Sequence, residues 1–182
     1  MTTSATGSQS TNSLAALRKV WLTMDPQAKK QTLRMFSNGM YVMTSWKGED
    51  YGAATVTWVS QASFRPPLVM AAIRRDSNVY KCLSKSGVAA IHILGQDQHG
   101  LAQGFFAPTR TTPGMLNGVR FVKGITGAPI LEGLPAYVEC RLCQTLDGRG
   151  DHAIVVLEVV EAVCCEVVKP LLIADSPWEY GG

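Results

Sequence analysis

The chain has 182 residues, of which 46% are hydrophobic and 17% are charged, so it can form one domain with a sizeable core that needs no metal or disulfide staples. Its formal net charge of +3 is small and its lysines and arginines are dispersed, which argues against a nucleic-acid surface. No apolar run reaches the roughly 18 to 20 residues that a membrane span requires.

The N-terminal segment is polar and lacks the basic and apolar regions of a signal peptide. We therefore predict a disordered tail over 1–12 and a single domain over 13–182. Apolar residues at helical spacing predict a short helix over 13–24. A second helix is predicted over 25–36, with Asp25 as N-cap and Pro26 at its first position.

From Gly39 onward the hydrophobic period changes to two, which is typical of strands. Strands are predicted over 39–46, 53–60, 68–73, 88–94, 137–146 and 152–168, with a break at Arg65-Pro66-Pro67 and a hairpin turn over 147–151. Helices are predicted over 79–87, ending at Gly87, and over 96–106. The segment 108–118 is predicted to be a functional loop, and 170–182 has strand character before it becomes irregular.

Many strands with few helices between them predict a mainly β fold, an antiparallel barrel or sandwich. The five cysteines are odd in number and irregularly spaced, which favours a reducing cytoplasm over a disulfide framework. Cys140-x-x-Cys143 falls within a predicted strand, where residues three apart point to opposite faces. We interpret these residues as core cysteines, and no histidine pair has metal-ligand spacing, so no metal site is predicted.

Polar side chains are unusually frequent in residues 51–80. On a continuous strand Thr55 and Thr57 share one face, while Trp58 and Ser60 share the other. Hydroxyls and backbone N–H groups at a sheet edge suit a planar heterocycle, and Arg74 with Ser77 suits a phosphate. The alternative is that Thr and Ser are simply good strand and turn residues. The residues by themselves leave both interpretations open.

Two histidines occupy informative places. His92 lies inside an apolar strand and is predicted to be half-buried, whereas His152 follows Gly150-Asp151 at the mouth of a hairpin. His152 either reaches over a ligand or is a solvated turn residue. The sequence has no GxSxG, GxGxxG or GxxxxGK[ST] motif, which argues against a serine triad, a Rossmann site and a P-loop.

Three motifs occur in order along the chain: T-x-T-W-V-S-x-x-S-x-x-P-P-L, S-G-x-x-A-x-x-I-L-x-x-x-Q, and G-D-H. Through them, residues 36 to 170 resemble the flavin reductase-like, FMN-binding split-barrel family. Many members of that family have Ser-Ser or Asn-Ala where this chain has Thr57-Trp58, which looks more like the flavoredoxin-type branch.

The resemblance implies an antiparallel split β-barrel with short flanking helices, a homodimer, and flavin near the subunit interface. By motif position, the residues along the isoalloxazine ring would be Thr55, Val56, Thr57, Trp58 and Val59. Those for the ribityl chain and phosphate would be Ser63, Arg74, Ser77 and Asn78. Phe106 matches the aromatic residue that follows the helix containing Leu101-Ala102. His152 matches the residue near the nicotinamide and flavin rings, in an orienting role.

The activity that the resemblance implies is reduction of flavin by NADH or NADPH, with FMN ahead of FAD, and hydride passing from nicotinamide C4 to flavin N5. Reduced flavin would then serve a monooxygenase or a redox protein. One alternative is a tightly bound FMN electron carrier, and another is a non-enzymatic flavin-binding or cofactor-binding protein. Trp178 or Tyr180 would cover the flavin, cap the dimer, or belong to a packed tail.

Overall fold

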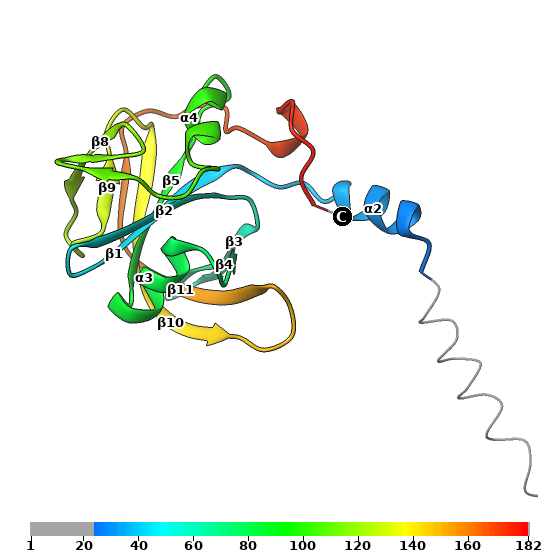
Figure 1. Cartoon of the computed structure of the whole chain (residues 1–182), viewed down its shortest axis with the longest axis horizontal. Helices are drawn as coiled ribbons and strands as arrows, with labels where there is room; N and C mark the ends of the chain where they lie inside the picture. Colours follow the sequence, from blue (N-terminus) through cyan, green and yellow to red (C-terminus); the bar gives the residue numbers. More distant parts are fainter. Residues whose placement is uncertain (1–23, 182) are drawn as a thin grey trace, which may run out of the picture. The chain divides into compact units, whose positions relative to one another are not determined.

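The computed structural model describes residues 24–181 of the chain (Figure 1). The predicted tail and nearly all of the predicted helix over 13–24 lie outside this range, so the single domain over 13–182 stays a prediction. The described residues divide into two compact units, one with residues 24–36 and 180–181, the other Ser37–Glu179. Along residues 24–181, no helix has both the length and the apolar character needed to cross a bilayer.

Helix α2 (Pro26–Arg34) confirms the predicted helix start. The Asp25 carboxylate accepts hydrogen bonds from the backbone N–H groups of Gln27 (3.1 Å) and Ala28 (3.2 Å), and Pro26 occupies the first position. These are the contacts that satisfy the free donors of a helix N-terminus. At the other end of α2, Arg34 Nε donates to the Gly181 carbonyl at 3.0 Å.

Within Ser37–Glu179, seven strands form one antiparallel sheet in the order β2-β1-β5-β10-β11-β4-β3. The strands are β1 Tyr41–Lys47, β2 Asp50–Val56, β3 Val59–Phe64, β4 Pro67–Arg74, β5 Val88–Ile93, β10 Ala136–Leu146 and β11 His152–Cys164. The two edge strands, β2 and β3, follow one another in the sequence and are joined by Thr57 and Trp58. Such a link spans at most about 11 Å. The sheet therefore curls until its edges nearly meet without closing, which confirms the predicted antiparallel split barrel.

The prediction of one strand over 53–60 is wrong, because the chain changes sheet edge at Thr57-Trp58. β2 pairs with β1 up to Val56, whereas β3 pairs with β4 from Val59 onward. The shared faces inferred for Thr55 with Thr57 therefore do not hold across the break. Alternation of apolar residues cannot reveal where a strand leaves one partner for another.

A smaller antiparallel sheet within residues 111–131 consists of β6 Thr111–Thr112, β7 Met115–Leu116, β8 Val119–Lys123 and β9 Pro129–Leu131. The segment 108–118, predicted as a loop, thus contains the β6–β7 hairpin. Buried polar side chains tie this sheet to the barrel: Thr44 Oγ1 donates to the Pro129 carbonyl (2.5 Å), and the Glu139 carboxylate accepts from the N–H groups of Ile125 (3.0 Å) and Thr126 (2.8 Å).

Helix α3 (Asn78–Ser86) lies against β1 and β2 and ends at Gly87, whose φ of 70° is left-handed, as predicted. A Cβ on Gly52 would come within 2.5 Å of the Val79 Cα, so only glycine lets β2 approach α3 this closely. Helix α4 (His99–Gly104) is shorter than predicted. The strand character expected near the C-terminus is wrong, because η1 (Ile173–Asp175) and isolated bridges at Leu172 and Pro170 occur there instead.

The main core packs α3 against the barrel strands through Met43, Ile73, Leu83, Ile91 and Leu157. Cys140 is part of this core, as predicted, but Cys143 is exposed. The register of β10 shifts between Leu142 and Gln144, and this bulge turns Cys143 outward. All five cysteines lie within the described residues and are free thiols.

His92 is fully buried, which corrects the prediction of a half-buried residue. Its Nε2 accepts from the Leu131 N–H (3.0 Å), and its Nδ1 lies 2.9 Å from the Val42 carbonyl. Because Nε2 is the acceptor, Nδ1 carries the proton and donates to that carbonyl. Burial lowers the pKa of His92 to about 4.

This shift predicts that the free energy of unfolding decreases as the pH is lowered from about 6.5 to about 4. In that window the unfolded chain binds a proton at residue 92 that the folded chain rejects, so acidification should lower the free energy of unfolding by about 3 kcal/mol. Urea unfolding at pH 7.5 and pH 4 should show this loss in the parent chain and much less of it in His92→Gln. His99→Gln, which removes a half-buried imidazole outside the buried network of His92, should behave as the parent. An equal loss in His92→Gln would contradict the assignment.

Candidate functional site

The split of the barrel brings Trp58 onto His152. Trp58 lies between β2 and β3, where its carbonyl accepts from the Ala72 N–H at 2.9 Å, and its side chain is 36% exposed. The indole and the imidazole of His152, at the start of β11, have ring centroids 4.7 Å apart at an interplanar angle of 49°. Two motifs that are far apart in the sequence therefore form one aromatic surface.

The acid next to His152 sets the orientation of this imidazole. Asp151 Oδ1 lies 2.8 Å from His152 Nδ1, and the Asp151 carbonyl accepts from the Arg75 N–H at 3.2 Å. The hydrogen bond from His152 holds the pKa of Asp151 below its ordinary value. A carboxylate at Nδ1 favours the tautomer protonated there and leaves Nε2 to face other groups. Sequence reasoning missed Asp151, although it stands directly before His152.

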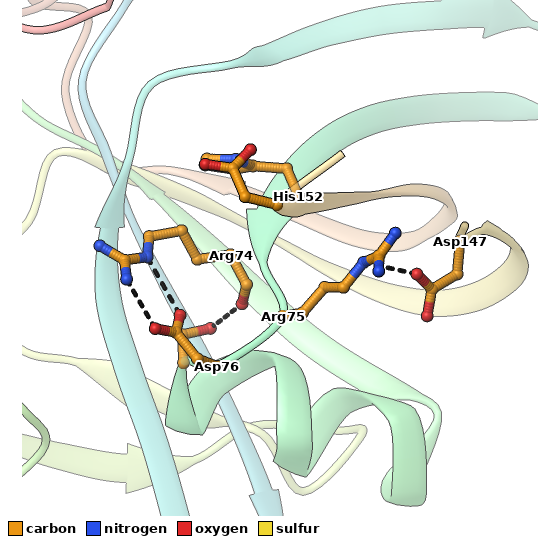
Figure 2. Close-up of polar contacts among 7 residues, drawn as sticks. Arg74, Arg75, Asp76, Asp147 and His152 are labelled. Carbon is orange, nitrogen blue, oxygen red and sulfur yellow. Dashed lines mark hydrogen bonds and ion pairs between the residues drawn. The ribbon is translucent and has the colours of Figure 1, made fainter. Parts of the chain in front are cut away.

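Arg74 lies opposite His152 in the antiparallel pairing of β4 with β11. Its guanidinium makes a two-pronged ion pair with Asp76, with Nε 3.0 Å from Oδ1 and Nη2 2.6 Å from Oδ2. The hydrogen bond from Arg74 lowers the pKa of Asp76. Figure 2 shows Arg74 and Arg75 reaching in different directions, Arg75 toward Asp147, with Nε 2.5 Å from Oδ1. Sequence reasoning also missed Asp76.

Ser77 caps α3 directly after this ion pair. Its Oγ accepts from the Tyr80 N–H (3.3 Å) and donates to the Arg74 carbonyl (2.6 Å). Asn78, the first residue of α3, is exposed. The end of β4 and the N-terminus of α3 thus bring Arg74, Ser77 and Asn78 together, at a helix end that favours anions.

Ser63 does not join this group. It pairs with Leu68 at the opposite end of β4, six residues and therefore about 20 Å from Arg74 along the strand. Val56 is buried and Val59 is half-buried, both packed in or against the core. Of the stretch predicted to line a flavin ring, Trp58 has the most accessible side chain.

Thr55 and Phe106 both contact the segment around α4. Thr55 donates from its hydroxyl to the Ala102 carbonyl (2.7 Å) and from its N–H to the Phe105 carbonyl (3.1 Å), so both donors serve the fold. Phe106 is half exposed and packs edge-on against Trp178, with centroids 4.9 Å apart. Trp178 therefore belongs to a tail that packs on α4.

Among the side chains that the structure describes, no group of three or more His, Cys, Asp or Glu residues is arranged to hold a metal ion. The chemistry available at the split is aromatic stacking, a cationic fork and a helix N-terminus. Such groups bind a planar heterocycle that carries a phosphate better than a metal or a covalent intermediate.

Residues 33–179 match the model of the flavin reductase like domain, and the chain belongs to this family. It is 32% identical over 147 residues to diflavin flavoprotein A 1 of Synechocystis sp., covering 80% of this chain and 25% of the relative. The chain thus spans about a quarter of the length of the diflavin relatives it matches.

Two shorter proteins are also similar. FMN reductase (NADH) RutF of Pseudomonas syringae is 28% identical over 107 residues, which is 59% of each chain. The styrene monooxygenase flavin reductase of Pseudomonas putida S12 superposes with a TM-score of 0.67 at 25% identity, covering 81% of this chain and 91% of that one.

Proposed function

We propose that this chain is an NAD(P)H-dependent flavin reductase that binds FMN in preference to FAD. The observation that carries the proposal is the Trp58–His152 aromatic pair at the split, with Arg74 and Ser77 beside it at the start of α3. A relative named FMN reductase (NADH) supports both the flavin and the class of reductant. The hydride donor in this proposal is NADH or NADPH.

The residues at the split fit FMN. The indole and imidazole offer an aromatic surface to a tricyclic ring, and the guanidinium fork with the α3 N-terminus offers hydrogen-bond donors to a phosphate. When bound, the flavin supplies the hydride acceptor for the nicotinamide. Asp151 fixes the imidazole through Nδ1, and only 14% of the His152 side chain is exposed. We assign His152 to orientation of the rings and charge balance, since hydride transfer needs no protein acid or base.

The test is anaerobic stopped-flow mixing of the protein with FMN or FAD and with each pyridine nucleotide. We expect loss of flavin absorbance with at least one nucleotide, and a reduction rate lowered about 10-fold or more in His152→Ala, because a positioning group lost from the rings raises the barrier. Flavin affinity should change little in that variant. If neither nucleotide reduces either flavin, the proposal is lost and the non-enzymatic binding protein is the alternative that the result supports. An unchanged rate in His152→Ala would remove that residue from the site.

A tightly bound FMN carrier is the second candidate, and similarity to the diflavin flavoproteins over 80% of the chain favours it. In that case reduced flavin would stay bound and pass electrons to a redox protein, whereas a reductase would release it to a monooxygenase. A carrier purifies yellow with stoichiometric FMN, and a reductase that uses flavin as substrate purifies largely colourless. The five free thiols support a reducing compartment such as the cytoplasm in either case.

Arg74 provides the residue-level test of the phosphate site. Arg74→Ala should weaken FMN binding about 10-fold or more, because a charge-assisted contact to phosphate is lost. Riboflavin, which lacks the phosphate, should bind the variant as it binds the parent. Fluorescence titration of both flavins measures the two affinities. Equal weakening of FMN and riboflavin would contradict the assignment.

We also propose that the chain forms a homodimer through the outer face of the sheet. Pairing of β4, β11 and β10 places Leu146 opposite Ile154, and Val156 opposite Met70. Leu146, Ile154 and Met70 are exposed, and Val156 is half-buried. A contiguous apolar face of this kind is typical of a subunit contact.

Light scattering coupled to size exclusion tests the dimer. Ile154→Arg should give a monomer at micromolar concentration, because it places an unpaired charge in the contact. Val122→Arg, which makes the same kind of change at an exposed residue of β8, should stay dimeric. A parent chain that runs as a monomer, or an Ile154→Arg variant that remains a dimer, would overturn this contact.

A further inference from the structure

The Arg74–Asp76 ion pair occupies the groups that a phosphate would use. Asp76 takes Nε and Nη2 of the guanidinium, the edge that also binds phosphate in a two-pronged manner. Its carboxylate stands one residue before the α3 N-cap, Ser77, where a phosphate would benefit from the helix N-terminus. A carboxylate of the chain and a phosphate of the ligand therefore compete for the same donors.

This ion pair has little structural use. It joins residues two apart in one turn, and the two side chains are 63% and 68% exposed. The neighbouring pairs differ: Asp147, from the β10–β11 turn, binds Arg75 and accepts from the Tyr80 hydroxyl, tying that turn to β4 and α3, and Asp151 holds His152. A local, exposed pair contributes little to stability, so removal of Asp76 should leave the fold intact.

We propose that Asp76 sets the affinity for phosphorylated flavin by holding the Arg74 guanidinium until the flavin phosphate displaces it. This inference rests on the proposed function. It names a residue that decides whether the flavin is exchangeable or tightly held. Asp76 lowers the affinity for FMN, has no effect on riboflavin, and keeps FMN exchangeable. It acts on the ligand through Arg74 and is a specificity residue rather than a catalytic one.

The test is a double-mutant cycle on the full chain at low ionic strength. FMN and riboflavin are titrated by flavin fluorescence against the parent, Asp76→Asn, Arg74→Ala and the double variant. We expect Asp76→Asn to strengthen FMN binding by about three- to fivefold, the scale of an exposed ion pair, and to leave riboflavin unchanged. In the Arg74→Ala background the Asp76→Asn change should have no effect on FMN.

Glu132→Gln is the matched control, because it removes the acid of another exposed ion pair, with Arg120 of β8, and leaves the Arg74–Asp76 pair in place. Its effect on FMN should stay below about twofold, as expected for a screened charge. An equal gain from Asp76→Asn in both backgrounds would overturn the proposal in favour of simple charge repulsion.

No gain from Asp76→Asn, in a chain whose Arg74→Ala variant selectively loses FMN, would overturn the Asp76 role alone. Failure of the parent to bind either flavin would overturn the proposed function with it. Equal loss of FMN and riboflavin in Arg74→Ala would remove the phosphate site on which both rest.

Discussion

The two-residue link between the edge strands is the constraint on which the rest of this structure depends. Thr57 and Trp58 carry the chain from β2 on one edge of the sheet to β3 on the other, and a link this short holds the two edges within about 11 Å. The sheet must curl into a barrel with a narrow split. The Trp58 carbonyl accepts from Ala72, which fastens the link to β4.

The same constraint gathers the candidate site. Because β3 pairs with β4 and β4 pairs with β11, the link lies over the start of β11, where Trp58 contacts His152. The chain leaves β4 at Arg74 and enters α3 through Ser77, so the cation and the helix N-terminus come to the same place. Gly52 allows α3 to approach β2 this closely. Among the polar groups buried elsewhere, His92 and Glu139 hydrogen-bond to the smaller sheet and its connecting turn and thereby stabilise the fold.

Sequence rules that consider a few neighbouring residues correctly predicted the features that such residues determine, namely the helix ends. Asp25, Pro26 and Gly87 mark helix ends because capping and left-handed φ depend on a few adjacent residues. The break at Thr57-Trp58 escaped prediction because alternation does not specify a strand's partner. The bulge that exposes Cys143 and the distance of Ser63 from Arg74 depend on register, which no single strand reveals. Asp76 and Asp151 were missed because their significance lies in which cation or imidazole they contact. Family resemblance assigned both Trp58 and His152 to the surroundings of one flavin ring, but their direct contact came from the structure.

A crystal structure of the protein with FMN tests the central claim most directly. We expect the isoalloxazine ring at the split, in contact with Trp58 and His152, and the phosphate at the N-terminus of α3, with Arg74 turned from Asp76 to the phosphate. Flavin bound away from the split, for instance in the cavity of about 330 Å³ lined by Gln98, Cys165 and Glu166, would contradict the account.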